Sequence, residues 1–87
     1  MFAKKLLKAD GTEEKLERKF TLEQAQKLVG GYIEFVRMVD DALCLVVNEE
    51  GLIFNLPLNH KATRLVHPDV LHNGIRGNAI IVTRKSM

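Results

Sequence analysis

The segment at residues 42–47 constrains the fold more than any other part of this chain. It reads ALCLVV and is apolar at every position. A strand with one solvated face alternates apolar and polar residues, whereas a strand covered on both faces is apolar throughout. The segment therefore predicts a central strand that needs cover on two sides. One short helix covers one face only, so we expect the remaining chain or a second subunit to cover the other, and we expect subunits to meet at this strand.

Two further apolar runs flank this strand in an antiparallel meander. Residues 32–39 precede it across Asp40 and Asp41, and residues 52–56 follow it across the link at residues 48–51, which ends in Gly51. Four residues closed by a glycine are typical of a hairpin loop built on a type I turn. We therefore predict three adjacent antiparallel strands in this part of the chain.

The N-terminal third of the chain predicts a hairpin. Residues 2–9 and 12–20 flank Asp10 and Gly11, a pair that tolerates the backbone angles of a tight turn. The first segment is predicted to be a strand. The second is rich in Glu, Lys and Arg, so it is either a polar edge strand or an irregular arm.

A short helix is predicted from Thr21 onwards. Thr21 and Gln24 have the spacing of a capping box, in which each side chain bonds a backbone N–H of the other residue. Gly30 or Gly31 supplies the left-handed residue that ends a helix. One helical face carries the apolar residues Leu22, Ala25, Leu28 and Val29.

The C-terminal third is less regular. Residues 57–67 form either a helical turn through residues 60–66 or an ordered loop, residues 78–83 predict a β-branched strand, and residues 84–87 form a basic tail. With 87 residues the chain has room for one core only. We therefore predict a single α+β domain over residues 1–87, with a small antiparallel sheet of about five to six strands (hairpin, then meander) and one short helix packed on one face.

Composition narrows the compartment and the partners. A single cysteine, Cys44, cannot form an internal disulfide, which fits a reducing environment, and no apolar stretch is long enough for a signal peptide or a membrane span. We expect a cytoplasmic protein. The formal net charge of +2 counts against a protein that mimics the acidic backbone of DNA, and it is too small to indicate nucleic-acid binding by itself.

The residues that carry chemistry give no catalytic pattern. Cys44 lies in the most apolar run, where burial keeps a thiol inert. His60, His67 and His72 have no usual zinc spacing, and the only serine, Ser86, is next to the C-terminus. We therefore expect no enzymatic activity, no metal and no cofactor.

One polar cluster is a candidate site for an anionic ligand. It combines amides, a hydroxyl and cations, which together supply the hydrogen-bond donors and charge that an anion requires. The alternative is that the amides bond loop backbone while the cations are solvated. The cluster consists of Asn55, Asn59, His60, Lys61, Thr63 and Arg64, with Arg76 and Asn78 at the entrance to the last strand.

Basic residues also gather at both ends of the chain. They include Lys4, Lys5, Lys8, Lys15, Arg18, Lys19, Arg84 and Lys85. These residues lie together only if the first and last strands are neighbours in the sheet. Few aromatic residues and several glutamates are interspersed, so a solvated face and weak nucleic-acid binding both remain open.

Several sequence motifs together resemble a known family. LEQAQKLVGGYIEFV, LVVNEEG, LPLNHKATRLV and the terminal GNAIIV resemble the small proteins of the domain of unknown function 3846 family over about residues 1 to 83. The resemblance implies an accessory protein of a phage or another mobile element in a bacterial host, with no assigned activity. In that setting small proteins often act by binding.

The residues favour a homo-oligomeric, non-catalytic protein that binds a small anionic ligand. The resemblance implies that this ligand is a nucleotide signal of host immunity and that the protein acts against host defence. One alternative is a protein-interaction module that inhibits a host enzyme through a sheet edge or an apolar face. Weak nucleic-acid binding by the two basic ends is another.

Overall fold

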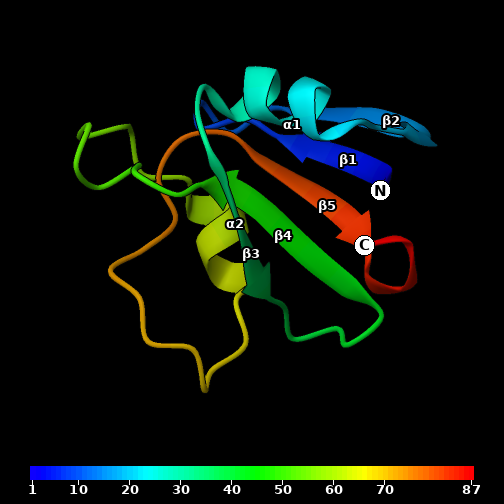
Figure 1. Ribbon diagram of the computed structural model, residues 1–87. Helices are drawn as coiled ribbons and strands as arrows, with labels where there is room; N and C mark the ends of the chain where they lie inside the picture. Colours follow the sequence, from blue (N-terminus) through cyan, green and yellow to red (C-terminus); the bar gives the residue numbers. More distant parts are fainter.

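The computed structural model describes residues 1–87 and shows one antiparallel sheet with a helix on each face (Figure 1). The strand order is β2-β1-β5-β4-β3, so the predicted α+β class and antiparallel sheet are confirmed. In chain order the elements are β1 (Phe2–Leu7), β2 (Glu13–Lys19), α1 (Leu22–Val29), β3 (Ile33–Arg37), β4 (Leu43–Asn48), α2 (His60–Leu65), β5 (Ala79–Thr83) and a 3-10 turn (Arg84–Ser86).

The N-terminal hairpin is confirmed. β1 and β2 pair antiparallel, and Gly11 at the turn has a φ of 93°. The Asp10 side chain accepts hydrogen bonds from the backbone N–H and the hydroxyl of Thr12, which holds the turn closed. β2 is a polar edge strand rather than an irregular arm, and its charged side chains discourage pairing with another chain.

Helix α1 begins and ends where the sequence predicts. The hydroxyl of Thr21 accepts a hydrogen bond from Gln24 N at 3.1 Å, and the Gln24 side chain accepts one from Thr21 N at 2.9 Å. Gly30 ends the helix with a φ of 83°. The helix packs through the buried Ala25 and Val29, while Leu22 in its first turn stays exposed.

The predicted third strand of the meander, at residues 52–56, is wrong. These residues belong to a series of turns closed by local hydrogen bonds, including Phe54 N to Glu50 O at 3.0 Å and Leu56 N to Gly51 O at 2.9 Å. The place beside β4 is taken by the C-terminal strand β5 instead. The structure favours this arrangement because β5 buries its side chains on both faces, whereas residues 52–54 remain exposed.

Strand β4 is covered on both faces by the chain itself. One face packs in a cluster with Val29 of α1, and the other packs in a second cluster with Ala62 of α2 and Ile75. Leu45 and Val46 are consequently 0% exposed. The chain itself therefore supplies the second cover of β4, through α2 and the segment after it, and no second subunit is needed for this purpose.

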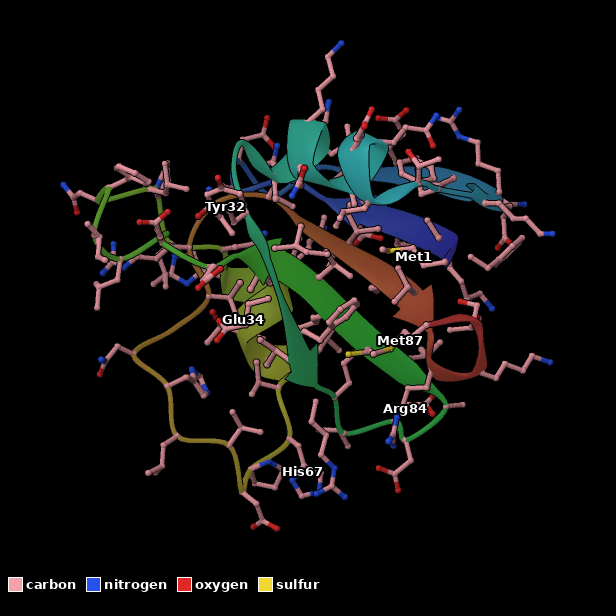
Figure 2. The ribbon with its side chains drawn as sticks, in the orientation of Figure 1. Met1, Tyr32, Glu34, His67, Arg84 and Met87 are labelled. Carbon is pink, nitrogen blue, oxygen red and sulfur yellow. The ribbon has the colours of Figure 1, made fainter.

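The last strand lies in the middle of the sheet. β5 pairs with β1 on one side and with β4 on the other. The first and last strands are thus neighbours, and the chain ends meet: Phe2 N donates to Ser86 Oγ at 2.7 Å, and Figure 2 shows Met1 and Met87 on the same side of the molecule. This pairing brings the two basic ends of the chain together.

Candidate functional site

Asn59 is a structural residue and not part of an open ligand site. Its side chain is 1% exposed and caps α2, where Oδ1 accepts from Ala62 N at 3.1 Å. Nδ2 donates to Leu7 O at 3.0 Å and to Gly77 O at 2.9 Å. Both donors are used inside the protein, so Asn59 has no free N–H for a ligand.

Thr63 and Asn78 are also engaged by backbone. Thr63 Oγ1 donates to Asn59 O at 2.7 Å and accepts from Ile75 N at 2.9 Å. Asn78 donates to Leu28 O at 3.3 Å and accepts from Ala9 N at 3.1 Å. The amides of Asn59 and Asn78 thus bond backbone, as the alternative expects of amides, and the Thr63 hydroxyl also bonds backbone.

The remaining five predicted residues do not gather at one place. Asn55 and His60 are exposed and make no side-chain hydrogen bond. Arg76 donates from Nη1 to Leu56 O at 3.2 Å and borders a cavity beside β3. Only Lys61 and Arg64 remain together, on α2 where it faces the β1–β2 hairpin.

Glu13 links α2 to the hairpin through two ion pairs. Its Oε2 lies 2.9 Å from Lys61 Nζ, and its Oε1 lies 2.8 Å from Lys5 Nζ. The hydrogen bond from Lys5, followed in size by that from Lys61, lowers the pKa of Glu13 to about 2, because both ammonium groups favour the charged carboxylate. Two lysines from distant parts of the sequence therefore converge on one point.

Lys61 and Arg64 border a shallow groove that continues across the sheet. A hollow of about 310 Å³ lies between α2 and the hairpin. It adjoins a larger hollow of about 510 Å³, and Lys5 and Ile81 line both. We call this surface the cationic groove. Its charged residues are Lys4, Lys5, Lys15, Lys61 and Arg64 with Glu13 and Glu17, and its apolar residues are Leu7, Leu43, Leu65 and Ile81.

The groove has an excess of positive charge. Five cations against two carboxylates leave a net charge of three positive units. Lys5 and Lys15 are opposite each other in the β1–β2 pairing. In the sequence both lysines group with the basic chain ends, whereas in the fold α2 lies beside Lys5. The hairpin alone signals the Lys5–Lys15 pair, but nothing local predicts where α2 docks.

A bulge explains why the consecutive residues Lys4 and Lys5 border the same groove. Ala3 and Lys5 pair with the adjacent residues Val82 and Ile81 of β5, so Lys4 is an extra residue in β1. A bulge redirects side chains that would otherwise alternate between faces. In β2 the irregularity includes Glu17, which has a φ of 46°.

The other candidates for chemistry lie apart from the groove. Cys44 is buried, its Sγ donates to Val36 O at 3.3 Å, and burial raises the pKa of its thiol. Nδ1 of His67 accepts from Asp69 N and Nδ1 of His72 accepts from Gly74 N, so both bond local turns. Nowhere do three or more His, Cys, Asp or Glu side chains gather as a potential metal site. Neither helix has the length and apolar character needed to cross a bilayer.

The chain matches one known sequence family over nearly its whole length. Residues 4–86 match the family described as Domain of unknown function (DUF3846). This chain belongs to that family. No curated protein and no solved structure matches the chain.

Proposed function

We propose that this protein is a non-catalytic binding protein and that its cationic groove takes a small anionic ligand, with phosphate-bearing nucleotides as the leading class. The observation that supports this proposal is the convergence of Lys5, Lys61 and Arg64 beside an apolar floor. Such a combination suits a ligand with a charged end and an apolar body.

Each charged residue has a distinct role in this proposal. Lys5 and Lys61 already converge on the carboxylate oxygens of Glu13, which shows that their ammonium groups reach a common acceptor. A phosphate placed beside them offers more oxygen acceptors and more negative charge than one carboxylate does. Arg64 adds a planar guanidinium that binds phosphate through two parallel hydrogen bonds. Glu13 competes with the ligand for the two lysines.

The apolar floor accounts for the rest of the ligand. Leu43 and Ile81 line the larger hollow, and Leu65 lines the smaller one. A nucleobase has two flat apolar faces and needs such a surface, whereas inorganic phosphate does not. We therefore propose that nucleotides bind more tightly than inorganic phosphate.

The family setting suggests how such binding is used. In a phage or mobile element the protein would sequester a nucleotide signal of host defence in the bacterial cytoplasm. The proposal also includes self-association, supported by the exposed turn of Leu52, Ile53 and Phe54, whose side chains are 57%, 77% and 60% exposed. Three adjacent exposed apolar side chains are unusual on a monomer surface and typical of an interface.

The groove proposal is tested by titrating isotope-labelled protein with nucleotides at low salt. The panel holds mononucleotides, cyclic mononucleotides, cyclic dinucleotides, inorganic phosphate and a short single-stranded oligonucleotide, which also tests the nucleic-acid alternative. We expect amide shifts at the groove with at least one nucleotide. The double substitution of Lys61→Met with Arg64→Met should weaken binding at least tenfold, and Glu13→Gln should strengthen it several-fold because the competing carboxylate is lost.

A matched control is Lys27→Met, which removes one cation from the exposed surface of α1. It should leave binding unchanged. Absence of shifts across the panel at millimolar concentration would overturn the proposal, as would equal binding by the groove double variant. Binding of the oligonucleotide alone, with affinity that falls steeply with added salt, would instead favour the nucleic-acid alternative.

A further inference from the structure

Strand β3 has one free edge. β3 pairs only with β4, and Glu49 N donates to Tyr32 O at 2.9 Å in that pairing. Hydrogen bonding alternates along an antiparallel pair, so Tyr32, Glu34 and Val36 direct their N–H and C=O groups to β4. The backbone groups of Ile33, Phe35 and Arg37 therefore point away from the sheet.

The position beside β3 is filled at one end only. His67 N donates to Arg37 O at 2.9 Å, and Val39 N donates to Leu65 O at 2.9 Å. Val66 thus forms an isolated β-bridge with Met38. The pairing stops there because the His67 carbonyl accepts from Val70 N and Asp69 N donates to His67 Nδ1, so both groups are used in a local turn and the chain bends away from β3. The N–H and C=O groups of Ile33 and Phe35 are left without partners in the chain.

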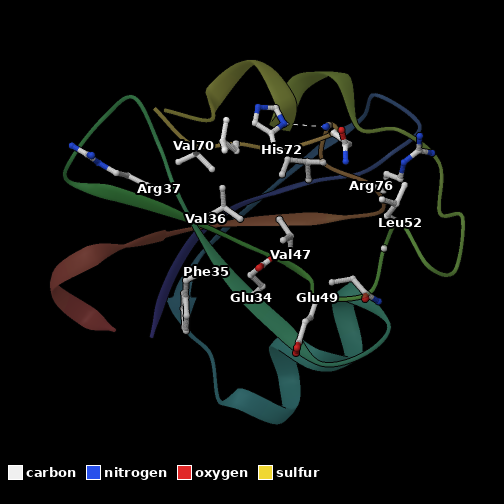
Figure 3. Close-up of a pocket in the computed structure, with 16 residues that line it drawn as sticks. Glu34, Phe35, Val36, Arg37, Val47, Glu49, Leu52, Val70, His72 and Arg76 are labelled. Atoms are coloured by element: carbon white, nitrogen blue, oxygen red, sulfur yellow. Dashed lines mark hydrogen bonds between the residues drawn. The ribbon is translucent and has the colours of Figure 1, made fainter. Parts of the chain in front are cut away.

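A cavity lies along this open edge. It has a volume of about 460 Å³, with Glu34 to Arg37 on one wall and Val70 to Arg76 on the other (Figure 3). Val36 and Val47 supply apolar surface inside it. Its charges are mixed: Glu34 and Glu49 border it together with Arg37 and Arg76, and Arg76 Nε is buried without a hydrogen-bond partner.

We propose that this edge binds an extended peptide segment of another protein, which adds to the sheet beside β3 and continues the line begun by Val66. The free groups of Ile33 and Phe35 supply up to four backbone hydrogen bonds. Alternate side chains of an added strand point to the same face. Apolar residues at alternate positions would therefore fill the cavity over Val36 and Val47, and a polar residue between Glu34 and Arg76 would complement their opposite charges.

A second copy of β3 fits this edge less well than a foreign peptide. Two-fold pairing centred on Glu34 would set two carboxylates directly opposite each other, which is unfavourable. Pairing centred on Phe35 would require Ile33 N to bond the partner's Arg37 carbonyl, which already accepts from His67 N. The peptide site is also separate from the cationic groove, since the two share no lining residue.

The test starts from a display library of random linear decapeptides, selected on the full-length protein. The strongest peptide is then synthesised and titrated into labelled protein. We expect enriched peptides with apolar residues at alternate positions, and we expect hydrogen exchange at the amides of Ile33 and Phe35 to slow at least tenfold on binding. In the free protein these two amides should exchange much faster than those of Glu34 and Val36.

Two substitutions separate backbone pairing from side-chain contact. Phe35→Pro removes an outward N–H that β4 does not use and should weaken peptide binding at least tenfold, while Phe35→Ala keeps that N–H and should retain most of the affinity. The groove double variant should bind the peptide normally. Failure to enrich any peptide, or binding without added protection at Ile33 and Phe35, would overturn the proposal even if nucleotide binding were confirmed.

Discussion

At the scale of single residues, Asn59 holds together three parts of the molecule. One amide caps α2 and bonds carbonyls of β1 and of the turn before β5. The same residue type in a loop after a strand also suits a ligand site, and residue identity does not distinguish the two roles. Burial decides between them, and burial depends on where β1 and Gly77 lie in the fold.

Replacing Asn59 with Ala should destabilise the protein by about 3 kcal/mol or more. Loss of a helix N-cap costs about 1 kcal/mol, and two buried carbonyls left without donors add about 1 kcal/mol or more each. Urea unfolding measures the change. His60→Ala, at the exposed neighbouring position, should change stability by less than about 0.5 kcal/mol. A loss below about 1 kcal/mol for Asn59→Ala would show that these hydrogen bonds matter little.

Glu13 should make stability depend on pH in the acid range. Its pKa is lowered from 4.5 to about 2 by Lys5 and Lys61, so the unfolded chain binds this proton more readily than the folded protein does. The stabilising contribution is therefore present above about pH 4.5 and is lost as the pH falls toward 2.

Urea midpoints of the wild type and of Glu13→Gln, measured from pH 6 to pH 2, check this expectation. The wild type should be the more stable at pH 6, and the difference should shrink toward zero at low pH and also with added salt. Glu14→Gln is a matched control, because Glu14 makes no ion pair. A difference between wild type and Glu13→Gln that stays constant over this range would contradict the low pKa.

At the scale of elements, the two apolar segments at residues 52–56 and 78–83 competed for the place beside β4. Both resemble strands in the sequence, and the first is closer along the chain. β5 occupies the place because there its backbone pairs with two strands at once, β1 on one side and β4 on the other. The backbone N–H groups of residues 54–56 instead form hydrogen bonds within local turns.

Deleting residues 79–87 should therefore leave the chain unfolded. The deletion removes the strand that joins the β1–β2 hairpin to the β3–β4 pair, together with the buried Ile80 and Val82. Far-ultraviolet circular dichroism and the spread of amide signals measure the result. Deleting Met87 alone, whose side chain is exposed, should preserve the fold. Native-like signals from the longer deletion would show that the two halves associate without β5.

At the scale of the whole molecule, the exposed apolar turn and the cationic groove are built by different parts of the chain. The turn at Leu52, Ile53 and Phe54 follows β4, whereas the groove lies over the β1–β2 hairpin and α2. Self-association through the turn would therefore leave the groove open to ligand. This separation allows the two parts of the proposed function to be tested independently.

Light scattering after size-exclusion chromatography tests self-association. We expect the mass of the wild type to rise above 9.8 kDa with increasing concentration, and Ile53→Glu should stay at the monomer mass, because a buried carboxylate disfavours an apolar contact. Leu71→Glu is the matched control, since Leu71 is 99% exposed but lies outside the turn. A monomer mass for the wild type at every concentration would contradict self-association.

The sequence by itself determined the hairpin, helix α1, the buried strand β4 and the final β-branched strand. All four follow from contacts between residues close in the chain: side-chain periodicity, a capping box and turn residues. Only the tertiary structure decided that β5 lies between β1 and β4, that α2 covers the second face of β4, and that Lys5 meets Lys61 across Glu13. These features depend on pairing and docking between distant segments, for which the local pattern offers several equivalent solutions.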